Sequence, residues 1–252
     1  MSVEILGLLI TFLLGLFILV GAIITIGMGN SKKIIEYCLG LALGVIVTLI
    51  ITDLLPEIME NIKLSKIYIA LIGMIIGYML LKILDRFIPD HDHEHNHHKK
   101  DVEDNLIHIG IITSIALIIH NIIEGMAVYS SAITANKSLV IGMILGVGFH
   151  NIPLGMVIAS SIYQTNKSKT KTIISILAVS ISTFIGGLII YIFHIKNIEG
   201  TLLGILLSLT LGMLLYIVID ELIPRIKAIK NKKNAIYGII TGVIVLLITL
   251  FF

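Results

Sequence analysis

The sequence predicts an all-α polytopic membrane protein, and its composition carries that prediction. Apolar residues make up 57% of the 252 residues, and the mean hydropathy is +1.05. Soluble domains reach only roughly 45–50% apolar residues even when glycine is included. Charged residues make up 13% and there are only four prolines, which disfavours a soluble enzyme with a charged surface, a collagen and a disordered chain. The single cysteine, Cys38, excludes an intramolecular disulfide framework.

Eight apolar runs follow one another along the chain, each about as long as a helix that crosses a hydrocarbon core of about 30 Å. Such continuous runs satisfy their backbone in a bilayer only as helices, whereas the strands of an outer-membrane barrel alternate in polarity. The first run has neither the basic start nor the cleavage site of a signal peptide. An alternative is that one weak run, such as 66–84, does not cross. The predicted spans are 5–27, 34–55, 66–84, 106–131, 139–162, 172–193, 201–223 and 235–252.

Lysine and arginine are unevenly distributed between the connections of these spans. Fourteen lie in the odd-numbered connections and four in the even-numbered ones. Basic connections tend to stay on the cytoplasmic side, so we expect both termini outside the cell. We expect residues 1–252 to form a single transmembrane domain with a flexible, histidine-rich cytoplasmic loop at 85–105.

Three ionisable side chains lie deep in the predicted spans, where an unpaired charge costs several kcal/mol. His120 and Glu124 are four residues apart, so they share one face of the fourth helix. His150 lies near the middle of the next, antiparallel helix and meets them at a similar depth. Two imidazoles and a carboxylate suit zinc, and also iron(II), manganese or nickel. The alternative is a buried hydrogen-bonded network that only joins the helices.

The residues around the two histidines repeat. His120-Asn121-Ile122-Ile123-Glu124-Gly125-Met126 and His150-Asn151-Ile152-Pro153-Leu154-Gly155-Met156 agree at five of seven positions. Such similarity between neighbouring helices suggests paired elements of one site, as in transporter repeats. The predicted metal ligands are His120, Asn121, Glu124, His150 and Asn151.

These two motifs resemble the paired fourth- and fifth-span motifs of the ZIP family of divalent-metal transporters, His-Asn-x-x-Glu-Gly and His-(Asn/Asp)-x-Pro-Glu-Gly. Asp53-Leu54-Leu55-Pro56-Glu57 and Asp220-Glu221-Leu222-Ile223-Pro224 also resemble family patterns. The resemblance covers the whole chain, including eight spans, outward termini and the histidine-rich loop. It implies a multi-pass cell-membrane transporter that carries zinc, or iron, manganese or cadmium, into the cytoplasm as cargo rather than as a cofactor.

The chain departs from the family pattern at the fifth span, where Leu154 replaces a glutamate. Many members also have a glutamate in the sixth span, but residues 172–193 contain no acidic residue. In the family these carboxylates help to build a second, adjacent metal position. The resemblance therefore implies a divergent, prokaryotic-type member with one metal per site and Glu124 as its only deep carboxylate. Altered metal preference and a sensing role are alternative consequences.

Further acidic and histidine residues suggest a path for the ion. With the predicted orientation, Asp53 and Glu57 lie at the outer end of the second span, as an entrance, and Asp220 and Glu221 at the cytoplasmic end of the seventh, as an exit. The connection after the third span presents five imidazoles that are expected to bind metal weakly. These are His91, His93, His95, His97 and His98.

A transporter is not the only function these residues allow. A metal exporter or a metal sensor would use similar ligands, and an intramembrane metalloenzyme would need a His-Glu-x-x-His motif that the predicted spans lack. No nucleotide-binding phosphate loop occurs, and a divalent ion entering a cell gains about 4.6 kcal/mol per 100 mV of inside-negative potential. We expect contact with the lipid bilayer and no nucleic-acid partner. A homodimer stays open, since small residues at spacings of four serve packing within or between chains.

Overall fold

The described part of the chain is built from helices, as its apolar runs predict. The computed structural model describes residues 2–29, 31–87, 100–134, 137–166, 169–195 and 200–249. Within these ranges six helical segments are long and apolar enough to cross a membrane, and two shorter apolar helices accompany them. The eight segments coincide with the eight predicted spans, including the run at 66–84. They are Val3–Met28, Lys32–Asn61, Leu64–Arg86, Ile111–Ile133, Ile144–Ser160, Ile173–Ile192, Thr201–Ala228 and Lys233–Ile248.

The individual helices are longer than the predicted spans at most ends. They are α1 (Val3–Met28), α2 (Lys32–Leu49), η1 (Ile50–Leu54), α3 (Leu55–Asn61), η2 (Leu64–Lys66), α4 (Ile67–Phe87), α5 (Lys100–Thr134), α6 (Lys137–Asn166), α7 (Lys169–Ile192), α8 (Thr201–Tyr216), η3 (Ile217–Leu222), α9 (Ile223–Ala228) and α10 (Lys233–Thr249). The two ends of the predicted loop at 85–105 lie in helices, since α4 continues to Phe87 and α5 begins at Lys100, and residues 88–99 lie outside the described residues.

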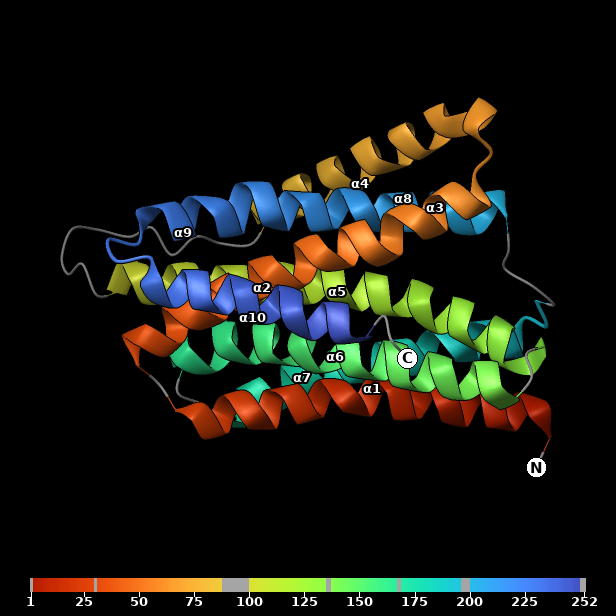
Figure 1. Cartoon of the computed structure of the whole chain (residues 1–252), viewed down its shortest axis with the longest axis horizontal. Helices are drawn as coiled ribbons and strands as arrows, with labels where there is room; N and C mark the ends of the chain where they lie inside the picture. The colour runs from red at the N-terminus through yellow and green to blue at the C-terminus, as the bar shows by residue number, and fades with distance from the viewer. Residues whose placement is uncertain are drawn as a thin grey trace.

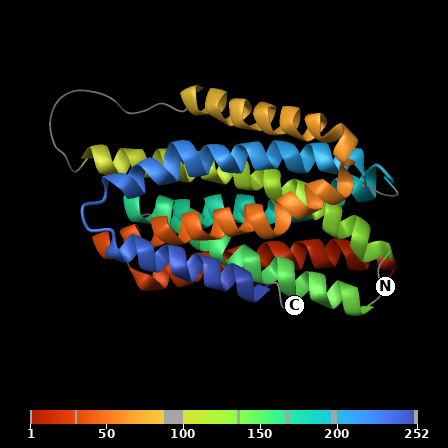
Figure 2. The same cartoon turned by 45° about the horizontal axis from the view of Figure 1, so that its top comes forward.

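The helices form a bundle with one common long direction (Figure 1). Four of them, α1, α5, α6 and α7, pack on one another, while α2 packs on α10 and α4 on α8. Both views place α4 and α1 on opposite sides of the bundle (Figures 1 and 2). Large apolar side chains of α4, such as Ile72, Ile75 and Met79, are exposed, as expected for a helix that faces lipid.

Two membrane segments contain a π-helical turn. In the second segment η1 joins α2 to α3, and in the seventh η3 joins α8 to α9. Each turn holds an acidic residue and is followed by a proline, Pro56 or Pro224, in the first turn of the next helix. A π turn widens the helix by one residue and is frequent at functional sites.

The packing of α2 on α10 is repeated by α8 on α4. Gly242 of α10 faces the carbonyl group of Leu41 in α2. Gly77 of α4 faces the carbonyl group of Leu209 in α8, and Leu209 lies 168 residues after Leu41. Likewise Gly44 faces the backbone of Ile239, and Gly212, also 168 residues later, faces that of Met74. The second and seventh segments are therefore structural repeats in matched surroundings. The chain thus has a second internal repeat, besides the one between the two histidine motifs of the fourth and fifth segments.

Close approach of helix backbones explains most of the glycines in the spans. A Cβ at Gly77 would overlap the carbonyl oxygen of Leu209, and no rotamer change relieves a clash with backbone. Gly146 differs, because a Cβ there would have open space around it.

We predict that Gly77→Ala lowers the melting temperature of the purified protein, because it forces α4 away from α8. Overpacking of this kind costs about 1–3 kcal/mol. Gly146→Ala is the matched control and should be neutral or slightly stabilising, since alanine favours helix by about 1 kcal/mol over glycine. Thermal unfolding in detergent measures both, and equal melting temperatures for the two variants would contradict the predicted contact.

Candidate metal-transport site

Helix α5 supplies two of the three groups that meet at mid-depth. His120 and Glu124 lie one turn apart, with Nε2 of His120 3.9 Å from Oε1 of Glu124. Helical periodicity alone places them on one face. His120 is 4% exposed, and the side chain of Glu124 is 11% exposed. The pair is therefore removed from solvent.

Helix α6 brings the third group against the same carboxylate. Nε2 of His150 lies 2.7 Å from Oε1 of Glu124, which is hydrogen-bonding distance. Pro153 lies inside α6 one turn later, and the helix continues through it. The ligand atoms of His120, Glu124 and His150 all lie within 4.8 Å of one another, and they form the metal-ligating cluster found among the described residues.

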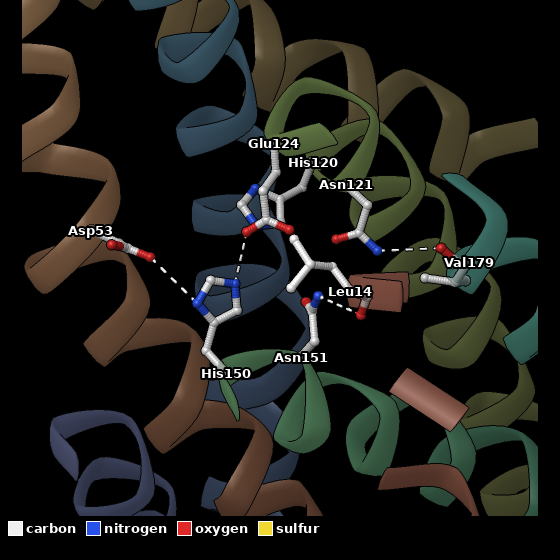
Figure 3. A network of polar contacts seen from close by, with 8 residues as sticks. All are labelled: Leu14, Asp53, His120, Asn121, Glu124, His150, Asn151 and Val179. Carbon is white, nitrogen blue, oxygen red and sulfur yellow. Dashed lines mark hydrogen bonds and ion pairs between the residues drawn. The ribbon is translucent and has the colours of Figure 1, made fainter. Parts of the chain in front are cut away.

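The second membrane segment adds the carboxylate of Asp53, which was predicted to lie at the outer end of that span. Oδ2 of Asp53 lies 3.6 Å from Nδ1 of His150 (Figure 3). The predicted span ended at residue 55, which put Asp53 at an outer end, whereas the helical segment continues to Asn61. Asp53 instead lies in the π turn η1, beside the deep site. Glu124 is therefore not the only carboxylate beside the histidines, although Asp53 is far more exposed than Glu124.

Asp53 and Glu124 differ in their surroundings. The side chain of Asp53 is 47% exposed and that of Glu124 is 11% exposed. Glu57, one turn beyond Asp53, lies within electrostatic range of Asp53, Glu124 and Glu60, all of them acidic. The acidic groups thus extend in one direction from His150 toward the end of α3.

The two asparagines of the motifs fix the site to the helices around it. Nδ2 of Asn121 donates to the carbonyl of Val179 in α7, 3.3 Å away, and Nδ2 of Asn151 donates to the carbonyl of Leu14 in α1, 3.2 Å away. Figure 3 shows both amide nitrogens directed toward those carbonyls. Each contact joins a histidine-bearing helix to a neighbour.

The glycine of each motif repeats this relationship one turn later. Gly125 packs on the carbonyl of Thr183 and Gly155 on that of Ile18, in each case four residues after the carbonyl that accepts from the asparagine. The asparagine and glycine that the two motifs share therefore make equivalent contacts, which pack α5 on α7 and α6 on α1.

Several buried polar atoms of the site have no hydrogen-bond partner on the described protein. They are both ring nitrogens of His120, Oδ1 of Asn121, Oε2 of Glu124 and Oδ1 of Asn151. Buried polar atoms normally find partners, and an unpaired one costs about 1–3 kcal/mol. All of these atoms except a protonated ring nitrogen can donate an electron pair, so they are suitable ligands for a metal cation.

The cluster is close to the geometry of a metal site. Bonds of about 2.0–2.2 Å to imidazole and carboxylate place tetrahedral ligands about 3.3–3.5 Å apart, and the three groups are at most 4.8 Å apart. Small side-chain rotations therefore suffice to close it around a zinc-sized ion.

Leu154 occupies the position that corresponds to Glu124 in the second motif. It follows His150 by four residues, as Glu124 follows His120, and it is 1% exposed. An apolar side chain there supplies no ligand.

The acidic pair of the seventh segment has its own partners. The hydroxyl of Tyr78 donates to Asp220, and Nη2 of Arg225 lies 2.9 Å from Oε2 of Glu221. Neither acid belongs to the cluster of three. The five histidines of the predicted loop, His91, His93, His95, His97 and His98, lie outside the described residues.

Comparison with known proteins identifies the family. Residues 88–250 match the family model described as ZIP Zinc transporter. The chain is 28% identical to the zinc transporter ZupT of Clostridium perfringens, over 99% of this chain and 96% of that protein. It is 27% identical to ZupT of Streptococcus mutans, over 96% and 95%, and 26% identical to ZupT of Escherichia coli O127:H6, over 95% and 93%.

The matched range covers more than half of the chain, so the chain belongs to the ZIP zinc transporter family. Members are transporters, which confirms the prediction of a multi-pass membrane transporter and excludes the metalloenzyme alternative.

We predict that the two histidines contribute differently to the stability of metal-free protein. His150→Ala removes the partner of a buried carboxylate and should cost about 3–5 kcal/mol. His120→Ala removes two unpaired nitrogens, so it should cost less, despite the cavity. Thermal unfolding in the presence of a chelator measures both variants. A larger loss for His120→Ala would show that the hydrogen bond between His150 and Glu124 is not the main contact.

Proposed function

We propose that the chain takes up zinc into the cytoplasm through one intramembrane site formed by His120, Glu124 and His150, with Asn121 and Asn151 beside it. The observation that carries this proposal is the cluster itself: a carboxylate and two imidazoles from two helices, buried, with unpaired atoms that suit a cation. The metal is cargo. The ZupT relatives are named as zinc transporters, and iron(II), manganese and cadmium suit the same ligands.

Asp53 is included as a further group that approaches the metal from the entrance side. It contacts His150 and is partly exposed, so it can meet an arriving ion before Glu124 does. Glu57 extends this acidic surface outward. Asp220 and Glu221 are proposed as the exit on the other side, where α9 lies at the opposite end of the bundle from α3 (Figure 1).

The orientation is part of the proposal. The fourteen to four distribution of basic residues supports termini outside the cell and α9 on the cytoplasmic side. In Figure 1, α1 begins at the end of the bundle toward which α10 runs, which supports both termini on one side. We retain one transporter domain over residues 1–252 and a cytoplasmic role for the histidines at 91–98.

Bilayer lipid around α4 and a homodimer also remain proposals. The exposed apolar side chains of α4 support the lipid contact. Small residues serve packing within the chain at Gly40, Gly44, Gly77 and Gly212, whereas Gly146 has open space beside it.

We predict that zinc uptake into proteoliposomes with an inside-negative potential falls at least about tenfold in His120→Ala and in Glu124→Ala, because each change removes a metal ligand. Glu4→Ala, an exposed acidic residue in the first turn of α1, is the control and should transport normally. A zinc-sensitive dye inside the vesicles measures the rate. Unchanged uptake in both site variants would disprove the proposed site.

We predict that Leu154→Glu raises the zinc bound at saturation from one to two ions per chain, because it places a second carboxylate one turn from His150. Leu154→Gln, of the same shape but uncharged, should still bind one. Equilibrium dialysis with elemental analysis gives the stoichiometry. A folded Leu154→Glu protein with one zinc would show that this position does not determine the number of ions.

A further inference from the structure

The repeat that relates the second and seventh membrane segments matches charged positions as well as packing positions. The spacing of 168 residues that pairs Gly44 with Gly212 also pairs Pro56 with Pro224. It pairs Asp53 with Glu221, and each lies in a π turn three residues before the proline. Asp53, which contacts His150 of the deep site, therefore has Glu221 as its counterpart in the seventh segment.

The next matched position reverses its charge. One turn beyond Asp53 stands Glu57, and at the matching place beyond Glu221 stands Arg225. The charged groups that act on Glu57 are acidic. Glu221, by contrast, is paired with the guanidinium of Arg225 at 2.9 Å, and the side chains are 9% and 24% exposed. Asp53 thus has a further acid one turn away, whereas the equivalent carboxylate of Glu221 has a guanidinium at that place.

We propose that Arg225 promotes release of the metal: its guanidinium competes with the departing ion for Glu221. This inference rests on the proposed zinc transport and on α9 being the exit side. At the entrance, two adjacent acids attract a divalent ion. At the exit, the tethered cation neutralises the acid, so the ion passes Glu221 without being retained.

The physical reason is that a transport path must bind its ion weakly enough to let it go. An unpaired, largely buried carboxylate on the exit side would hold a divalent cation and slow its dissociation, because no neighbouring positive charge offsets its attraction for the ion. Arg225 is four residues from Glu221 on a continuous helix, so it stays available when the ion has left.

Replacement of Arg225 by glutamate gives the exit the charge pattern of the entrance. We expect kcat for zinc uptake by reconstituted full-length protein to fall about tenfold, and KM to fall by a similar factor, because release becomes rate-limiting while capture is unchanged. The ratio kcat/KM should therefore stay near its native value. Arg225→Lys keeps the charge and should retain most of kcat.

Two comparisons separate this role from a structural one. Lys227→Glu makes the same charge change two residues away, at an exposed position of α9, and should leave both constants near native. In a Glu221→Gln background the exit keeps only the carboxylate that Arg225→Glu introduces, so the effect of Arg225→Glu should be much smaller there. An ordinary helix-stabilising pair predicts instead a lower kcat without a lower KM.

The inference is overturned if Arg225→Glu lowers kcat without lowering KM, if Lys227→Glu has the same effect, or if Glu221→Gln does not suppress it. Failure of the proposed transport function looks different. The native protein would then show no zinc uptake, or His120→Ala would transport like the native protein, whatever the Arg225 variants do.

Discussion

The carboxylate of Glu124 inside the bilayer is the constraint on which the rest of the site depends. A charge at this depth costs several kcal/mol unless a partner balances it. Here the partner comes from another helix, since His150 of α6 lies 2.7 Å from it, while His120 of its own helix is 3.9 Å away. The contact therefore also holds α5 and α6 at a fixed depth relative to each other.

Holding two helices at a fixed depth requires that their outer faces be fixed as well, and the motifs provide this. Asn121 and Asn151 each donate to a backbone carbonyl of a neighbouring helix, and a glycine one turn later lets the backbones touch. Because the amide nitrogen is used for packing, the amide oxygen is left unpaired. One residue type thus joins helices and offers an oxygen to the ion.

Sequence alone was sufficient for the spans and for placing His120 beside Glu124, because both follow from local rules. Continuous apolarity requires helices in a bilayer, and a spacing of four places His120 beside Glu124. Asp53 was misplaced for a physical reason. The span was predicted to end near residue 55, where polar residues and Pro56 begin, but the helix continues to Asn61 through a π turn. Such a turn changes the face on which a residue lies, and no local pattern marks it. The structural equivalence of positions 57 and 225 could be recognised only from the matched glycine contacts of the two repeats.

The loss of the glutamate at position 154 is consistent with the charge that Asp53 brings. Glu124 and Asp53 together supply two negative charges, which balance one divalent ion with two neutral imidazoles. A third carboxylate at 154 would leave an excess negative charge and favour a second ion. In the proposed site, Asp53 belongs to a different helical element from Glu124 and is 47% exposed. Two unit charges at about 4 Å interact by about 4 kcal/mol at an effective dielectric constant of about 20. Asp53 therefore adds an attraction for the ion that comes from outside α5 and α6, and its exposure to solvent weakens that attraction relative to the attraction of Glu124.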